Sequence, residues 1–261
     1  KLKHENIVRV YDADSVDGYS YIAQEYVQGT DMERLIEKRG PLSARRSVKI
    51  IRQIASALEH AHQLDIVHRD IKPSNLLVRR DGVVKLGDMG LARSMSEAGE
   101  SQITAVGAMV GTIDYISPEQ ADDSKSADAR SDIYSLGCTW YQMLTGSPPF
   151  PEGSLAERLN AHAIQPPPDP RNISPDVPEG IVAVLTRMMA KSPDRRYQTA
   201  GELLEDLDFS TLTQDTVTND VLASLSDSAG SFQLGGSSET SPATPQIETI
   251  AIECPDCGQD Y

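Results

Sequence analysis

Apolar residues recur at helical spacing along much of the chain, and the longest such stretch runs from 43 to 64. Its apolar positions repeat every three or four residues, as on one face of a helix, and Ser43 stands where an N-cap is expected. The segment 132–144 is apolar nearly all round, which predicts a buried helix. Two further helices are predicted over 179–190 and 200–206.

Short runs of β-branched and aromatic residues predict strands before and after the longest helix. Strands are expected at 7–11 and 19–25, on either side of an Asp-Ser-Val-Asp-Gly turn, and a hairpin is expected from 76–78 to 83–86. The proline-rich run 166–170 predicts a stiff extended connector. The pattern therefore predicts an α+β fold with a mostly helical lobe and a partial β-rich lobe.

The charge of the chain is concentrated at its end. The 261 residues include 24 basic and 39 acidic side chains, yet no lysine or arginine follows Arg196. From 211 to 248 the composition shifts to Ser, Thr, Gly, Asp and Pro, which predicts a disordered acidic linker. This balance disfavours nucleic-acid binding, and no stretch approaches the roughly twenty apolar residues of a membrane span. We expect a domain over 1–208, a linker over 209–250 and a separate segment from 251 to 261.

Two short motifs carry the candidate chemistry. The run His-Arg-Asp-Ile-Lys-Pro-Ser-Asn (68–75) precedes Gly-Asp-Met-Gly (87–90), so two aspartates, a lysine and an asparagine fall on neighbouring loops. Phosphoryl transfer from a magnesium nucleotide to a hydroxyl uses such a set of side chains. In this order, the motifs resemble those of a eukaryotic-type (Hanks-type) bacterial Ser/Thr protein kinase. Further matching motifs at 111–119, 131–137 and 193–197 extend the resemblance over about residues 1–208.

The resemblance implies a role for each polar residue of the two loops. Asp70 would orient the substrate hydroxyl, and Lys72 would neutralise charge on the γ-phosphate of ATP. Asn75 and Asp88 would bind Mg²⁺, an ion that prefers oxygen ligands. Taken alone, Asn75 could be a loop cap and Asp88 a turn residue, but the ordered context favours the catalytic reading.

The resemblance also implies a nucleotide site and a regulated segment. The adenine base would bind the backbone of Glu25 and Val27, with Leu77 beneath it and Asp31 near the ribose. The polar Gln24 would narrow or hydrate the pocket behind the base. Arg69 would pair with a phosphate on the segment 94–110. The residues expected to be regulatory are the phosphosite Thr104 and Thr112, which would contact the catalytic loop.

Structural roles are implied for the remaining motif residues. Glu119 and Arg196 would form a buried ion pair, and Asp132 would begin the central buried helix. His68 would stack with Val10 and Met89. Met89 replaces the usual phenylalanine of this motif, and because methionine is adaptable we expect it to be tolerated.

Two functional classes stay open on the sequence. The chain starts inside the kinase resemblance and contains no Gly-rich phosphate loop and no Val-Ala-x-Lys strand, so we expect it to be a fragment that is weakly active or inactive. The parent protein would be a cytoplasmic Ser/Thr kinase that acts on protein substrates and autophosphorylates in trans. The alternative is a pseudokinase that binds partners without phosphoryl transfer, although the complete catalytic set favours the kinase.

The end of the chain carries a Cys-Pro-Asp-Cys-Gly motif. Cys254 and Cys257 have the spacing of the first half of a zinc ribbon, whose second cysteine pair is absent here. Two ligands leave a structural site incomplete, so a Zn²⁺ site is expected only in a longer protein. The alternative is a pair of unliganded thiols.

Overall fold

The computed structural model describes residues 2–16, 19–89, 113–123, 126–208 and 212–213. The strands are β1 (Val10–Val16), β2 (Tyr19–Gln24), β3 (Gly29–Asp31), β4 (Leu76–Arg79) and β5 (Val84–Leu86). The helices are α1 (Met32–Arg39), α2 (Ala44–His62), α5 (Pro118–Asp122), α6 (Ala129–Thr145), α7 (Leu155–Ile164), α8 (Glu179–Met188) and α9 (Ala200–Asp206).

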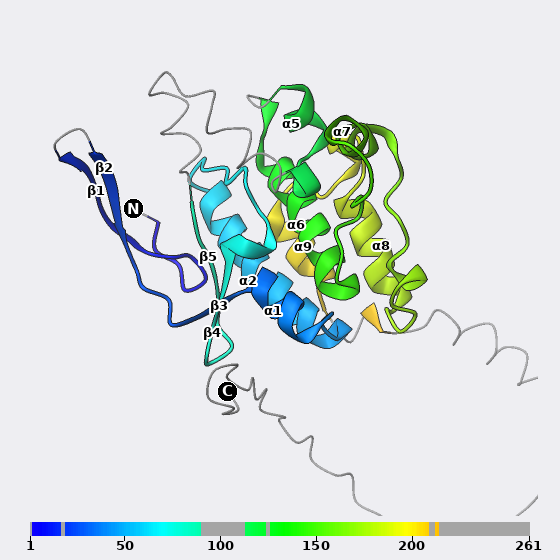
Figure 1. Ribbon diagram of the computed structural model, residues 1–261, viewed down its shortest axis with the longest axis horizontal. Coiled ribbons are helices and arrows are strands. Elements are labelled where there is room, and N and C mark those ends of the chain that lie inside the picture. Colours follow the sequence, from blue (N-terminus) through cyan, green and yellow to red (C-terminus); the bar gives the residue numbers. More distant parts are fainter. Residues whose placement is uncertain (1, 17–18, 90–112, 124–125, 209–211, 214–261) are drawn as a thin grey trace, which may run out of the picture.

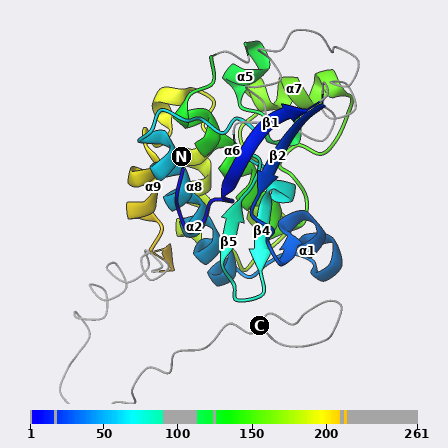
Figure 2. The ribbon, with the colours of Figure 1, turned by 90° about the vertical axis from the view of Figure 1, so that its left-hand side faces the viewer.

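The strands form two antiparallel sheets of unequal burial. The hairpin of β1 and β2 stands at the left of Figure 1, beside the helical body, whereas the sheet β3-β4-β5 lies against α1 and α2 (Figures 1 and 2). In β4, Leu76 and Val78 point into the core, and Leu77 alternates to the other face. The predicted fold, a helical lobe with a smaller β-rich part, is therefore confirmed.

The helical body is built around α6. Its side chains are buried on all sides, as the sequence predicts, and Trp140 at its centre is completely buried. The indole Nε1 of Trp140 donates a hydrogen bond of 2.8 Å to Ser47 Oγ on α2, so the two longest helices are joined by a polar contact inside the core. The predicted helices at 179–190 and 200–206 correspond to α8 and α9.

The first predicted strand was misplaced. Residues 7–11 do not form a strand that pairs with 19–25, since β1 begins only at Val10 and continues to Val16. Ile7 and Val8 are instead buried against β5, where Ile7 bridges Leu86 and the Val8 amide donates to the Leu86 carbonyl at 2.9 Å. An apolar Ile-Val pair satisfies either arrangement, so the sequence pattern could not separate them.

Three helices were not predicted, namely α1, α5 and α7. Each begins at a side chain that accepts a hydrogen bond from a backbone amide of the first turn: Asp31, Ser117 and Ser154. Ser43 does precede α2, but its side chain makes no capping bond. Within the described ranges, none of the helices has the length and apolar character needed to span a bilayer.

Candidate active site

The loop between α2 and β4 brings three of the predicted catalytic residues together. Lys72 Nζ lies 2.9 Å from Asp70 Oδ2, and both side chains are half-buried. The Asn75 amide nitrogen donates to the Asp70 backbone oxygen at 2.7 Å and to Asp70 Oδ2 at 3.2 Å. Because the amide nitrogen is turned towards Asp70, the amide oxygen of Asn75 is left to face another ligand.

The buried carboxylate of Asp132 holds this loop in place through hydrogen bonds to its backbone. Asp132, at the start of α6, is completely buried and accepts hydrogen bonds of 2.8 Å from the backbone amides of His68 and Arg69. His62 Nε2 on α2 lies 2.8 Å from the same carboxylate. These contacts fix the loop where Arg69 has a φ of 69°, a left-handed conformation that costs a non-glycine residue energy.

His68 connects the two motif loops. Its Nδ1 accepts a hydrogen bond from the Asp70 amide at 3.2 Å, so Nε2 must carry the proton that is donated to the Gly87 carbonyl at 2.8 Å. The Gly87 amide in turn donates to the Asn75 carbonyl at 2.8 Å. His68 is buried, and these bonds tie Asp70 to the turn that carries Asp88. His68 therefore fixes the position of Asp70 relative to the turn of Asp88.

Asp88 and Asn75 have the oxygen ligands that a magnesium nucleotide needs. Asp88 is exposed and has a φ of 53°, and within the described part of the chain no hydrogen bond engages its carboxylate. No cluster of three or more His, Cys, Asp or Glu side chains suited to a metal occurs among those residues. Mg²⁺ in nucleotide sites uses one or two protein carboxylates together with phosphate oxygens, so the pair fits such an ion.

Asp31 and Leu77, both predicted to bind the nucleotide, lie side by side on adjacent strands, because they are partners in the β3–β4 register. Leu77 is half-buried and lies beside Gly87 on the face of β4 turned away from the core. Asp31 also caps α1, since its Oδ1 accepts the Arg34 amide at 2.9 Å. At Gly29 a Cβ atom would come within 1.9 Å of the Val78 carbonyl, so only glycine fits this approach of β3 to β4.

Between β2 and β3, the predicted adenine-binding segment is held by a lysine that the sequence analysis missed. Lys85 on β5 is buried and its Nζ lies 3.1 Å from Glu25 Oε2. Burial alone would raise the pKa of Glu25, but hydrogen bonds from Lys85 and the Arg9 amide lower it overall. The Glu25 side chain is thus turned towards the protein. Val27 is half-buried, and Gln24 is exposed at the end of β2.

The predicted stack of three residues is only partly seen. Val10 and Met89 line the same pocket of about 280 Å³ beneath the β1–β2 hairpin, together with Ile7 and Val8. Met89 is partly buried and packs against the core. His68 does not line this pocket.

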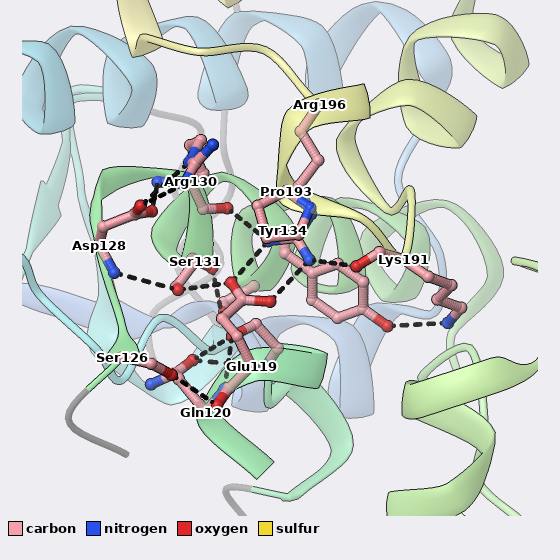
Figure 3. Close-up of polar contacts among 12 residues, drawn as sticks. Glu119, Gln120, Ser126, Asp128, Arg130, Ser131, Tyr134, Lys191, Pro193 and Arg196 are labelled. Carbon is pink, nitrogen blue, oxygen red and sulfur yellow. Dashed lines mark hydrogen bonds and ion pairs between the residues drawn. The ribbon is translucent and has the colours of Figure 1, made fainter. Parts of the chain in front are cut away.

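A buried ion pair between Glu119 and Arg196, here called the brace, connects α5 to the segment before α9 (Figure 3). Arg196 donates from both terminal nitrogens to Glu119, at 2.7 and 2.8 Å, and also binds the carbonyls of Ala190, Lys191 and Arg130. Burial would raise the pKa of Glu119, but hydrogen bonds from Arg196 and Ser131 lower it to about 2. The pair therefore remains charged, with its hydrogen-bonding groups satisfied.

The brace is coupled to the catalytic loop through one residue that the sequence analysis also missed. Gln120 follows Glu119 and its side-chain nitrogen donates to the Arg69 carbonyl at 3.0 Å. Ser117, where the resembling family usually has alanine, forms a capping box with Gln120. The brace, α5 and the loop are thus joined by consecutive hydrogen bonds.

Comparison with known proteins identifies the family of this chain. A model of the protein kinase domain matches residues 1–207. The chain belongs to the protein kinase family. The serine/threonine-protein kinase PknB of Mycolicibacterium smegmatis is 41% identical over 210 residues, which are 79% of this chain and 33% of that protein.

Other curated kinases give the same picture. PknB of Mycobacterium tuberculosis is 39% identical over 210 residues, with 79% of this chain and 33% of that protein covered. PknH of Mycobacterium bovis is 38% identical over 203 residues, covering 78% and 33%. The chain thus spans about a third of the length of these relatives.

The predicted regulatory residues Thr104 and Thr112 lie outside the described part of the chain, and so do Cys254 and Cys257 of the predicted half zinc site. The predicted linker over 209–250 lies there as well, apart from residues 212–213, and so does the whole segment 251–261. Arg69 is described, and its Nε is buried without a hydrogen-bond partner in that part of the structure.

Proposed function

We propose that the protein transfers the γ-phosphate of ATP to serine and threonine hydroxyls of protein substrates. The observation that carries the proposal is the hydrogen-bonded cluster of Asp70, Lys72 and Asn75, tied through His68 and Gly87 to the turn of Asp88. This arrangement supports the proposal, because it brings the side chains of Asp70, Lys72 and Asn75 together and links them to the turn that carries Asp88.

In this proposal, Asp70 accepts a hydrogen bond from the substrate hydroxyl and aligns its oxygen with the phosphorus. The loose transition state asks for positioning and charge neutralisation more than for early deprotonation. Lys72 lies beside Asp70 and meets the negative charge of the transferred group. The oxygens of Asn75 and Asp88 would hold Mg²⁺, which neutralises phosphate charge when bound.

The nucleotide would lie along the exposed face of β4. Leu77 supplies an apolar surface for the base, the backbone of Glu25 and Val27 supplies hydrogen bonds, and Asp31 lies at the ribose end. Asp31 would have to share its carboxylate between the ribose and the α1 cap. Lys85 fixes the Glu25 side chain and so helps to hold the backbone to which the base binds.

Regulation by phosphorylation is part of the same proposal. Arg69 has a buried Nε that lacks a partner among the described residues, and a phosphate on Thr104, added by a second copy in trans, would supply one. Thr112 would contact Asp70 and Lys72. A domain that consumes ATP in this way would work in the cytoplasm.

The proposal is tested by the chemistry of the product. A longer protein, in which a Gly-rich loop and a Val-Ala-x-Lys strand precede this chain, is incubated with γ-labelled ATP, Mg²⁺ and a general protein substrate, and the label is assigned by phosphoamino-acid analysis. We expect phosphoserine and phosphothreonine, both abolished by Asp88→Asn. Label on tyrosine would overturn the substrate class, and complete absence of transfer would favour the pseudokinase.

A further inference from the structure

A second pocket lies on the face of β4 opposite Leu77, since Val78 of β4 lines it. Residues of α1, α2 and the β4–β5 hairpin form its walls, and its volume is about 220 Å³. Its walls are mainly aliphatic, with contributions from Leu35, Leu42, Ile50 and Val78. Whole small-molecule sites usually measure about 300–1,000 Å³, so this space suits a few side chains of a peptide better.

Basic residues crowd around this pocket, although the chain as a whole carries a net charge of −15. Three exposed cations line it: Arg39, Arg46 and Lys49. More basic residues adjoin them at the end of α1, the start of α2 and the hairpin: Lys38, Arg45, Arg79 and Arg80. Glu37 and Asp81 are the acidic residues within the same segments, 37–39, 45–49 and 79–81.

Helix stability does not account for the charge at the start of α2. Arg45 and Arg46 occupy its first turn, which contains no acidic residue. The helix dipole is positive at that end and disfavours cations there. An apolar pocket with a basic rim instead matches a peptide that carries both aliphatic side chains and carboxylates.

We propose that residues 247–253 of the same chain bind in this pocket. Their sequence, Ile-Glu-Thr-Ile-Ala-Ile-Glu, contains three isoleucines and two glutamates, and no lysine or arginine occurs anywhere after Arg196. Isoleucine side chains would enter the aliphatic space, and Glu248 and Glu253 would face the basic rim. The proposal concerns binding and does not depend on phosphoryl transfer.

The connection is long enough for binding within one molecule. The chain contacts α2 at residue 207, since Arg52 Nη1 donates to the Leu207 carbonyl at 2.6 Å, and Leu212 then packs beside Gly180 of α8. Ile247 lies 34 positions after Thr213, a separation that can extend to about 110 Å. Attachment to the domain raises the effective concentration of the segment to about millimolar, so modest affinity suffices.

A second acidic and apolar stretch, residues 220–227, provides the competing assignment. It contains Val221, Leu222 and Leu225 between Asp220 and Asp227. Six residues lie between Thr213 and Asp220, so the start of this stretch can reach at most about 25 Å from Thr213. The start of 247–253 can reach about four times as far.

The test uses the whole 261-residue chain and a spin label on Cys254, with Cys257→Ser. The third cysteine, Cys138, is completely buried, and burial raises the pKa of its thiol to about 12, so it does not react. We expect the label to broaden amide NMR signals of residues that line the pocket, such as Leu42 and Gly82. The broadening should weaken at high salt, which screens the charges.

Variants separate this contact from nonspecific proximity. Ile250→Ser, which changes no residue of the described domain, should remove the broadening. The double charge reversal Arg46→Glu with Lys49→Glu should remove it as well. Arg195→Glu changes an exposed cation elsewhere and should leave it. The proposal would be overturned by uniform broadening of all signals or by broadening at another surface. It would also be overturned if pocket broadening persisted in Ile250→Ser. Pocket broadening from a label at Ser224→Cys, in a chain lacking Cys254 and Cys257, would reassign the occupant to residues 220–227 if the Cys254 label gives none.

Discussion

The substitution Glu119→Gln probes the buried brace with little change of shape. Arg196 is completely buried and Glu119 is 16% exposed, so water cannot replace the lost charge at Arg196. Glutamine keeps one hydrogen-bond acceptor but removes the negative charge that both terminal nitrogens of Arg196 contact. The variant therefore leaves a buried guanidinium with only neutral partners.

The cost follows from the pKa of Glu119. Its value falls from 4.5 to about 2 in the folded protein, and each pKa unit corresponds to about 1.4 kcal/mol, so the charged form contributes roughly 3 kcal/mol. Removing one partner of a buried ion pair typically costs about 3–5 kcal/mol. These two values agree, so we expect Glu119→Gln to lower the free energy of unfolding by about 3 kcal/mol.

Urea unfolding at several pH values checks this magnitude and its origin. Because the folded pKa is depressed, the stabilisation is complete above about pH 4.5 and is lost as the pH falls towards 2. The difference between wild type and Glu119→Gln should therefore shrink below pH 4.5. Asp194→Asn is the control, since Asp194 is 86% exposed in its pair with Arg130 and should cost at most about 1 kcal/mol. A difference that does not change with pH would refute the reasoning.

Three further predictions concern the nucleotide site and the end of the chain. Met89→Phe in the longer protein should change turnover by only a few fold, because both side chains fill one apolar space; activity restored to an inactive protein would favour the pseudokinase. The 261-residue chain, which contains no Gly-rich loop or Val-Ala-x-Lys strand, should give little thermal shift with Mg-ATP, and a large shift abolished by Asp88→Asn would contradict this. Cys254 and Cys257 should bind Zn²⁺ tightly only in a chain extended beyond Tyr261, so tight one-to-one binding by the present chain would disprove the half-site.

Contacts between residues that are close in sequence could be predicted from the sequence. Asp70, Lys72 and Asn75 are at most five residues apart, so any compact loop brings their side chains close together. The helices with a continuous apolar face, α2, α6, α8 and α9, were predicted for the same reason. In α1 the signal was present but overlooked, since Asp31 stands as an N-cap before Met32, Leu35 and Ile36.

Contacts between distant segments could not be derived from spacing. His62 and Asp132 are 70 residues apart, so no local pattern predicts that they meet. Lys85 appears in the sequence as an ordinary strand lysine, and only the pairing of β5 with residues 6–8 buries it against Glu25. The Glu119–Arg196 pair was expected only because the motifs around it resemble those of kinases.

The turnover of Asp70→Asn in the longer protein tests whether Asp70 serves phosphoryl transfer. Asp65→Asn is the control, because Asp65 is an exposed aspartate that precedes the catalytic loop by a few residues. Both variants should keep the melting temperature of the wild type. We expect Asp70→Asn to lower kcat by orders of magnitude and Asp65→Asn to leave kcat unchanged. Wild-type turnover in Asp70→Asn would show that Asp70 has no part in catalysis.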